Sequence, residues 1–266
     1  MEPLVLIHGF SGIPAMWDPV VPALQERFEV RTLGLAGHHG CAALKDGIEV
    51  STSALFDALE GDLDEAGFET AHICGNSLGG WAALELAKRG RARSCVALSP
   101  AGGWEPGTKA EKRLQRLFTR LYKSSQWADR RAEKLFLRPG VRKLAFRDAF
   151  EHGERMTPRQ AAELLHGAAQ CPIYWDLFNA IVRDGPPSDF DGIECPTTIV
   201  WGSKDRILTL KDYSERVRRM VPDAEWVVLD GAGHSPMLDE PERIVSIIEA
   251  TASRARERVA AADPAA

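Results

Sequence analysis

Three residues of types that could form a nucleophilic centre each follow a short, strand-like apolar run in this 266-residue chain. They are Ser77, Asp205 and His234, in that order along the chain. A histidine can take the hydroxyl proton of a serine as its oxygen attacks a carbonyl carbon, and a carboxylate can hold the imidazole in the required tautomer. The three residues therefore predict acyl transfer through a covalent intermediate on Ser77, if the fold brings them together.

The serine occupies the centre of the sequence GNSLG, at residues 75–79, between a strand-like run and a helix-like run. This context predicts a strand–turn–helix elbow with an exposed, strained serine. Glycines two residues before and after it avoid a clash because they have no Cβ. The helix that begins there directs free N–H groups and its positive dipole end at a developing oxyanion. We therefore predict Ser77 as the nucleophile and the N–H of Leu78 as an oxyanion-hole donor.

Three other loops complete the predicted site. The sequence HGF at residues 8–10 ends the first strand-like run, where the N–H of Phe10 is the expected second oxyanion donor. Asp205 ends the sequence WGSKD, and His234 lies in the sequence GAGHSP. Because parallel strands present their carboxyl ends at one sheet edge, Asp205 can serve as the orienting acid and His234 as the general base.

The ends of the chain alternate strand-like and helix-like runs, whereas the middle is helical. Expected strands are residues 4–7, 28–33, 71–74, 95–98, 197–201 and 226–229, and expected helices include 78–88, 210–220 and 241 to about 259, with 261–266 frayed. This pattern predicts an α/β fold with a mostly parallel, doubly wound sheet. Between residues 104 and 185, apolar residues at helical spacing begin at Leu114. We predict a core domain of residues 1–103 and 190–266 and a helical cap of residues 104–189.

The chain resembles the α/β-hydrolase superfamily in its HG pair at residues 8–9, its GNSLG and WGSKD sequences, and GH at 233–234 followed by EPE at 240–242. The resemblance covers roughly residues 1–103 and 190–260. It implies the Ser–Asp–His triad, no metal or organic cofactor, and a cap that selects the substrate. Members commonly carry one or two strands before the HG loop, so this sheet is expected to lack an edge. The loop LAGHHG at residues 35–40 departs from the Asp and GHG pattern often found there.

The resemblance implies a serine carboxylesterase for small or medium apolar acyl substrates. Thioester hydrolysis and carbon–carbon bond hydrolysis use the same triad and remain alternatives, as does acyl transfer to an acceptor other than water. A ligand-binding or receptor protein of this fold with little turnover is an alternative of another class. Haloalkane dehalogenases and epoxide hydrolases of the superfamily place an aspartate at the nucleophile position, so Ser77 argues against both of those reactions.

Substrate choice is expected to lie in the cap, whose aromatic residues could line an apolar pocket. We select Trp104, Trp175 and Phe178 as candidates, although most cap aromatics could instead form the cap's own core. Residues 108–148 carry a net charge of +9, which leaves −14 for the rest of the chain. This charge could steer anionic substrates to the cleft, or it could be only the solvated face of amphipathic helices.

Composition limits the partners of the chain. The five cysteines are odd in number and lack CxxC spacing, and the adjacent pair His38-His39 lacks zinc-ligand spacing, so we predict reduced thiols and no metal. No apolar run approaches the roughly 20 residues that span a bilayer, and no secretory signal precedes Leu4. A pI near 5.9 and the lack of a nucleic-acid motif argue against DNA or RNA as a partner. We predict a cytoplasmic protein with a small-molecule substrate, no nucleic acid and no membrane; the oligomeric state is open.

Overall fold

Six parallel strands form one sheet in residues 1–262, the part of the chain that this computed structural model describes. The order across the sheet is β2-β1-β3-β4-β5-β6, and each neighbouring pair is parallel. The strands are β1 (Glu2–Ile7), β2 (Phe28–Leu33), β3 (Ala71–Asn76), β4 (Ala92–Leu98), β5 (Thr197–Gly202) and β6 (Glu225–Leu229). The predicted α/β fold is confirmed, and the sheet is wholly parallel where the sequence predicted it to be mostly so.

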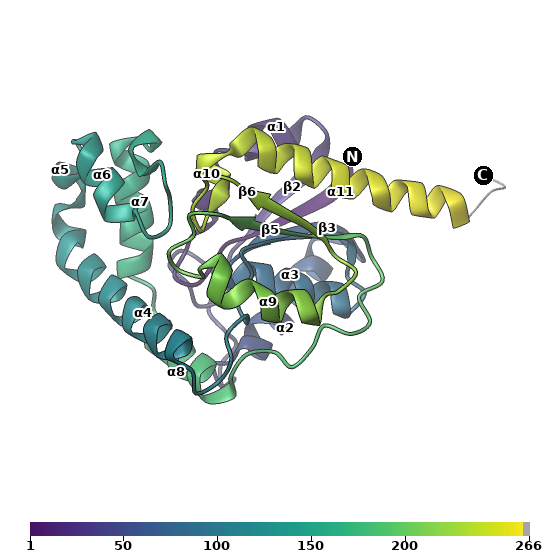
Figure 1. Ribbon diagram of the computed structural model, residues 1–266, viewed down its shortest axis with the longest axis horizontal. Helices are drawn as coiled ribbons and strands as arrows, with labels where there is room; N and C mark the ends of the chain where they lie inside the picture. The colour runs from purple at the N-terminus through teal and green to yellow at the C-terminus, as the bar shows by residue number, and fades with distance from the viewer. Residues whose placement is uncertain (263–266) are drawn as a thin grey trace.

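Alternating side chains along the strands explain why helices cover both faces of the sheet. Leu4 and Leu6 of β1 pack with helices α1 and α11, whereas Val5 and Ile7 pack with α2, α3 and α9. Both faces are therefore apolar, as a parallel sheet requires. Figure 1 shows α11 above the sheet and α3, α2 and α9 below it. These helices are α1 (Val21–Gln25), α2 (Thr52–Glu65), α3 (Leu78–Lys88), α9 (Leu210–Met220) and α11 (Pro241–Ala262).

The strand order creates a switch point beside β1. After β1 the chain moves outward to β2 at one edge, and it then returns to β3 on the other side of β1. The loops that follow β1 and β3 therefore diverge, and such a crevice is where open α/β sheets bind ligands. Phe10 follows β1 and Ser77 follows β3. The topology places the predicted nucleophile at this point.

A helical insert connects β4 to β5. Its first helix and its last pack on the main core, through Leu117 and Leu177 respectively. Phe136, Phe150 and Met156 form a separate small core among the middle helices, and Figure 1 shows this part of the insert standing away from the sheet. The predicted cap boundaries at residues 104 and 189 remain a prediction. The helices are α4 (Lys109–Ala128), α5 (Ala132–Leu135), α6 (Pro139–Phe146), α7 (Pro158–Ala169) and α8 (Tyr174–Asp184).

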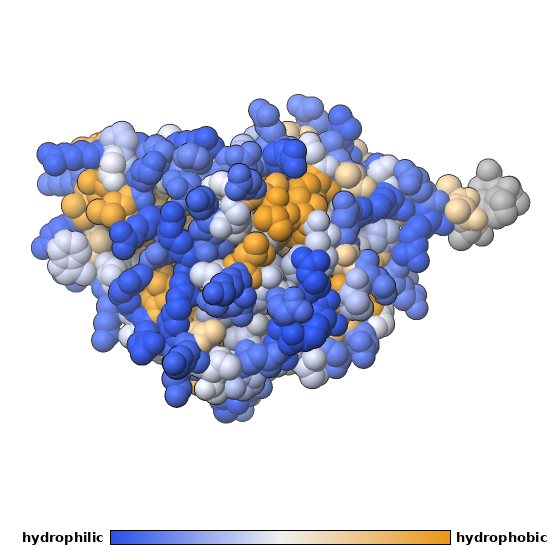
Figure 2. Space-filling view, in the orientation of Figure 1, coloured by the Kyte–Doolittle hydropathy of each residue, from blue (hydrophilic) through white to orange (hydrophobic). Residues whose placement is uncertain are grey.

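The last described helix, α11, extends to Ala262. Residues 261 and 262, which were expected to fray, belong to α11, and residues 263–266 lie outside the described part. Figure 2 shows a largely hydrophilic face with an apolar patch over β6, where Val228 is exposed. Among the helices of residues 1–262, none has both the length and the apolar character needed to cross a membrane.

Candidate active site

Ser77 lies in a strained turn between β3 and α3. Its φ of 59° and ψ of −116° are rare for a residue with a Cβ and cost about 1–3 kcal/mol. Three backbone hydrogen bonds hold this conformation: the Ser77 N–H donates to Leu98 O at 2.9 Å, and Ser77 O accepts from the N–H groups of Trp81 and Ala101 at 3.0 and 2.9 Å. The serine side chain is thereby presented at the carboxyl edge of the sheet.

Two glycines make this turn possible because other backbone atoms occupy the space where their Cβ would lie. A Cβ on Gly75 would be 1.9 Å from Gly79 O, and a Cβ on Gly79 would be 2.3 Å from Ile7 O. These contacts involve backbone atoms, which cannot rotate aside as a side chain can. The GNSLG pattern therefore reflects close packing of the elbow against itself and against β1.

We expect Gly75→Ala to lower the free energy of unfolding by about 3 kcal/mol or more, because the new methyl group overlaps Gly79 O. Gly61→Ala is the matched control, since Gly61 lies inside α2 and its Cβ would meet no atom within 4 Å. The control should gain about 0.5–1 kcal/mol from higher helix propensity. Urea unfolding measures both variants, and equal stability of Gly75→Ala and wild type would show that the elbow is not close-packed.

Asp205 and His234 form a buried hydrogen-bonded pair. His234 Nδ1–H donates to Asp205 Oδ2 at 2.8 Å, and the two residues are 4% and 5% exposed. The other carboxylate oxygen, Oδ1, accepts the N–H groups of Ile207 and Leu208 at 2.9 and 2.8 Å. Because a carboxylate only accepts, Nδ1 of the neutral imidazole carries the proton. Nε2 is therefore left as an acceptor that can take a hydroxyl proton.

Asn76, which sequence reasoning did not select, joins the elbow to the histidine loop. Its Nδ2 donates to Leu98 O at 3.1 Å and to His234 O at 3.0 Å, while its Oδ1 accepts the Ser235 hydroxyl at 2.8 Å. The side chain is buried, so all these bonds are shielded from water. Asn76 thus holds the histidine loop against the nucleophile turn. An amide directly before the nucleophile, at the end of a strand, was the available signal.

Asp239, the last residue of α10 (Pro236–Asp239), is a second residue that sequence reasoning missed. Its buried carboxylate accepts three backbone N–H groups, from Gly233 at 2.8 Å, Glu151 at 3.0 Å and His152 at 2.8 Å. The first belongs to the histidine loop and the other two follow α6 in the insert. Asp239 therefore links the position of the histidine loop to that of the insert.

The two residues predicted to supply oxyanion donors, Phe10 and Leu78, line the same pocket as the nucleophile. Leu78 is the first residue of α3, so its N–H has no acceptor within the helix. A Cβ on Gly9 would lie 2.9 Å from the Cβ of Ser77, which shows how closely the loop carrying Phe10 approaches. Phe10, Ser77 and Leu78 line one pocket. The structure thus brings these three residues together.

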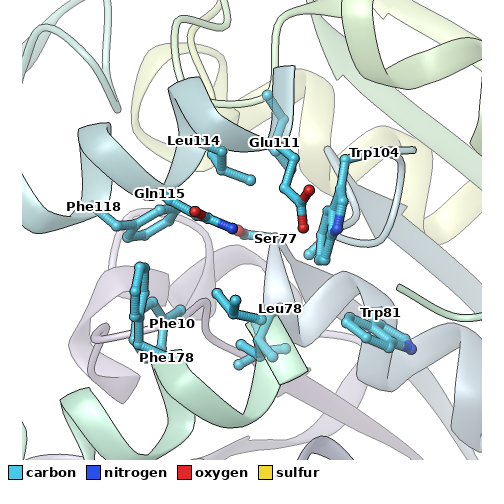
Figure 3. A pocket seen from close by; sticks show the side chains of 14 residues that line it. Phe10, Ser77, Leu78, Trp81, Trp104, Glu111, Leu114, Gln115, Phe118 and Phe178 are labelled. Carbon is cyan, nitrogen blue, oxygen red and sulfur yellow. The ribbon is translucent and has the colours of Figure 1, made fainter. Parts of the chain in front are cut away.

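That pocket has a cavity volume of about 60 Å³ and is almost wholly apolar. Trp104 and Phe178, two of the residues predicted to contact substrate, line it (Figure 3). Trp175 does not reach it, because it lies one helical turn before Phe178 on α8, beyond the end of the pocket. Its ring packs against Phe178 at 5.5 Å and is 39% exposed. Other lining residues are Trp81, Ala101, Glu111, Leu114, Gln115, Phe118, Ile181, Val182 and Leu208.

Ser77 also borders a second space, a broad open cleft between the insert and the core. This cleft shares Phe10, Phe118 and Phe178 with the pocket and includes His234 on its wall. Its other lining residues come mainly from α4, α6 and α7. The nucleophile thus stands between an apolar pocket and an open cleft. The two arms of an ester could occupy one space each.

Two buried histidines, His8 and His38, lie in the loops that follow β1 and β2. His8 Nδ1–H donates to Gly9 O at 2.8 Å, and its Nε2 accepts the Leu35 N–H at 3.1 Å. Burial and the neighbouring His38 lower the pKa of His8 to about 3, and burial lowers the pKa of His38 to about 4. His8 therefore stays neutral and joins two loops. Within residues 1–262, no group of three or more His, Cys, Asp or Glu side chains could hold a metal ion.

Several known proteins are similar to this chain over most of its length. Epoxide hydrolase EphH of Mycobacterium tuberculosis is 33% identical to this chain over 75% of this chain and 94% of the relative. A pimeloyl-[acyl-carrier protein] methyl ester esterase of Aromatoleum aromaticum is 28% identical over 92% of this chain and 96% of the relative. The solved structure of a thermophilic esterase from Thermogutta terrifontis superposes with a TM-score of 0.71 at 20% identity, covering 96% of this chain and 90% of that one.

The family model described as "Alpha/beta hydrolase family" matches residues 4–247. That range includes all of the sheet except the first two residues of β1, the helical insert, and all three residues of the predicted triad. The chain therefore belongs to the alpha/beta hydrolase family.

Proposed function

We propose that this chain hydrolyses carboxylic esters of small or medium apolar acyl groups through an acyl-enzyme on Ser77. The observation that carries the proposal is the buried 2.8 Å hydrogen bond between His234 Nδ1 and Asp205 Oδ2, on the wall of the cleft that Ser77 also borders. This arrangement leaves Nε2 free to act as a general base. The apolar pocket beside Ser77 supplies space for one arm of the ester.

In the first half of the reaction, His234 Nε2 takes the hydroxyl proton while Ser77 Oγ attacks the carbonyl carbon. The negative charge that develops on the carbonyl oxygen is stabilised by the N–H groups of Phe10 and Leu78. Collapse of the tetrahedral intermediate breaks the bond to the leaving alcohol, which receives the proton from His234. Asp205 stabilises the imidazolium throughout this step.

In the second half, a water molecule gives its proton to His234 and attacks the acyl carbon. A second tetrahedral intermediate then collapses, the acid leaves, and the proton returns to Ser77 Oγ. The same steps serve a thioester, so thioester hydrolysis remains an alternative, together with carbon–carbon bond hydrolysis.

Ester hydrolysis is proposed over epoxide hydrolysis, although one relative is named an epoxide hydrolase. Attack of a serine oxygen on an epoxide carbon would produce an ether. An ether has no carbonyl group for water to attack, so the enzyme would not be regenerated. A nucleophilic aspartate avoids this problem because its product is an ester, and residue 77 is serine.

The purified protein should therefore hydrolyse a p-nitrophenyl ester series from acetate to dodecanoate, with highest kcat/KM among the short and medium acyl chains. A parallel panel of epoxides, such as styrene oxide, should yield no diol. A matched series of thioesters tests the alternative that the protein is a thioesterase. Diol formation faster than ester hydrolysis would overturn the proposal, because it would require chemistry that Ser77 does not provide.

A binding protein of this fold would show neither ester turnover nor reaction of Ser77 with a fluorophosphonate probe. The acidic Asp205 partner of His234 favours the enzyme over that alternative. We also retain the prediction of a small-molecule substrate. The predicted cytoplasmic location is supported by the five free cysteines, because disulfides are rare in the cytosol. Fractionation of the producing cells would test the location.

A further inference from the structure

One carboxylate lies in the otherwise apolar pocket beside Ser77. Apart from Glu111, the lining residues that carry a polar side-chain group are Ser77, Gln115, Trp81 and Trp104. Figure 3 shows the Glu111 side chain extending from α4 into the pocket, with its carboxylate next to the ring of Trp104. Glu111 is thus the one charged residue among the described residues that line this pocket.

This charge is only partly satisfied within the protein. Glu111 Oε2 accepts the N–H of Gly107 at 2.7 Å, ahead of the first turn of α4. Among residues 1–262, no cationic side chain approaches the carboxylate to within the 4.0 Å of an ion pair. The neighbouring Arg113 is occupied elsewhere, because it donates to the carbonyls of Arg206 and Ile207. The carboxylate therefore has remaining acceptor capacity and no counter-ion.

A substrate arm that fills the pocket removes water from this carboxylate. An apolar arm would leave the charge desolvated without compensation, and an arm ending in a carboxylate would add a like charge in a medium of low dielectric constant. An ammonium group would instead pair with Glu111. It would also lie near the indole of Trp104, and the faces of aromatic rings attract cations.

We propose that Glu111 makes this pocket selective for esters that carry an ammonium group on the arm lying in the pocket. The inference rests on the proposed ester hydrolysis at Ser77 and adds a substrate class to it. The net charge of +9 on residues 108–148 does not oppose it, because long-range steering is screened by salt whereas a contact inside the pocket is screened much less.

A purely structural role is the competing explanation, since Glu111 also helps to begin α4. Thr108 is the N-cap of this helix and its Oγ1 accepts the Glu111 N–H at 3.3 Å. Glu111→Gln separates the two roles, because the amide oxygen can still accept the Gly107 N–H while the charge is removed. Glu133→Gln is the matched control: it removes the same charge from an exposed position of the insert, outside the pocket.

The test uses esters of equal length that end in trimethylammonium, carboxamide or carboxylate, in one series with the group on the acyl arm and in another on the alcohol arm. In the series whose terminal group lies in the pocket, wild type should prefer the trimethylammonium ester to the carboxylate ester by about tenfold or more in kcat/KM. Glu111→Gln should lose most of this preference, and Glu133→Gln should keep it. The carboxamide ester reports the basal reaction in each variant.

Two results would overturn the inference while leaving ester hydrolysis intact. The first is a wild-type preference for the carboxylate esters in both series. The second is a trimethylammonium-to-carboxylate ratio of kcat/KM that Glu111→Gln does not change. In both cases the carboxamide ester would be turned over normally. If wild type hydrolysed none of the esters, the proposed function would fail first and the substrate class with it.

Discussion

Ser77→Ala is expected to reduce kcat for p-nitrophenyl esters by about 10³-fold or more. Without the hydroxyl there is no acyl-enzyme, and only the oxyanion-hole donors and substrate binding can still assist attack by water. The loss should appear in kcat and kcat/KM alike, because the methyl group of alanine leaves the apolar pocket unchanged. Steady-state kinetics with the best ester of the chain-length series measures it.

Ser99→Ala is the matched control for this experiment. Ser99 is also buried and also has a positive φ, of 43°, but its hydroxyl has no hydrogen-bond partner within the described residues. Removing that hydroxyl should leave the kinetics close to those of wild type. If Ser77→Ala retained comparable activity, the assignment of the nucleophile would be wrong.

Asp205→Asn is expected to lower kcat by about 10²- to 10⁴-fold through the tautomer of His234. The N–H groups of Ile207 and Leu208 both point at Oδ1, so they would fix the asparagine with its oxygen toward them. Its NH₂ group would then face His234 Nδ1, which would have to accept. The imidazole proton would move to Nε2, and that nitrogen could no longer take a proton from Ser77.

Asp230→Asn controls for the change of charge at the same sheet edge. Asp230 is exposed and accepts the hydroxyl of Ser203, away from the Asp205–His234 pair. Kinetics of the two variants at equal pH, with folding checked by thermal unfolding, would separate a tautomer effect from loss of structure. If Asp205→Asn kept about a tenth or more of wild-type kcat, a different acid would orient the histidine.

The sheet could be predicted from the sequence because its strands are short apolar runs between turn-forming residues. All six predicted runs lie within observed strands, and the helix 78–88 has the observed bounds. The positions of Ser77, Asp205 and His234 followed from the same pattern, since each comes just after a strand of a parallel sheet. The local sequence was enough to predict these positions, because only short loops separate the three residues from the strands before them.

The residues that support the site could not be predicted in this way, because their partners lie far away in the sequence. Asn76 bonds to His234 O across 158 residues, and the three N–H groups that Asp239 accepts come from two separate segments. Trp175 shows a different limit. The aromatic residues of α8 predicted a pocket, but the sequence did not show that Phe178 would line it and Trp175 would not.

The pocket and the cleft explain why the substrate is the least predictable property. Their walls combine the β1 loop, the elbow, α4 and α8, so their polarity depends on how the insert packs against the sheet. Glu111 illustrates this point: in the sequence it is one of many charged residues of an amphipathic helix, whereas in the structure it lies beside Trp104.

The most direct test of the account is to label the protein with a fluorophosphonate probe and to locate the adduct by peptide mass spectrometry. We predict one adduct, on Ser77, which is suppressed by prior addition of a good ester and is absent from Ser77→Ala. An adduct on another residue, or no adduct in a preparation that hydrolyses esters, would contradict a mechanism in which His234 and Asp205 activate Ser77.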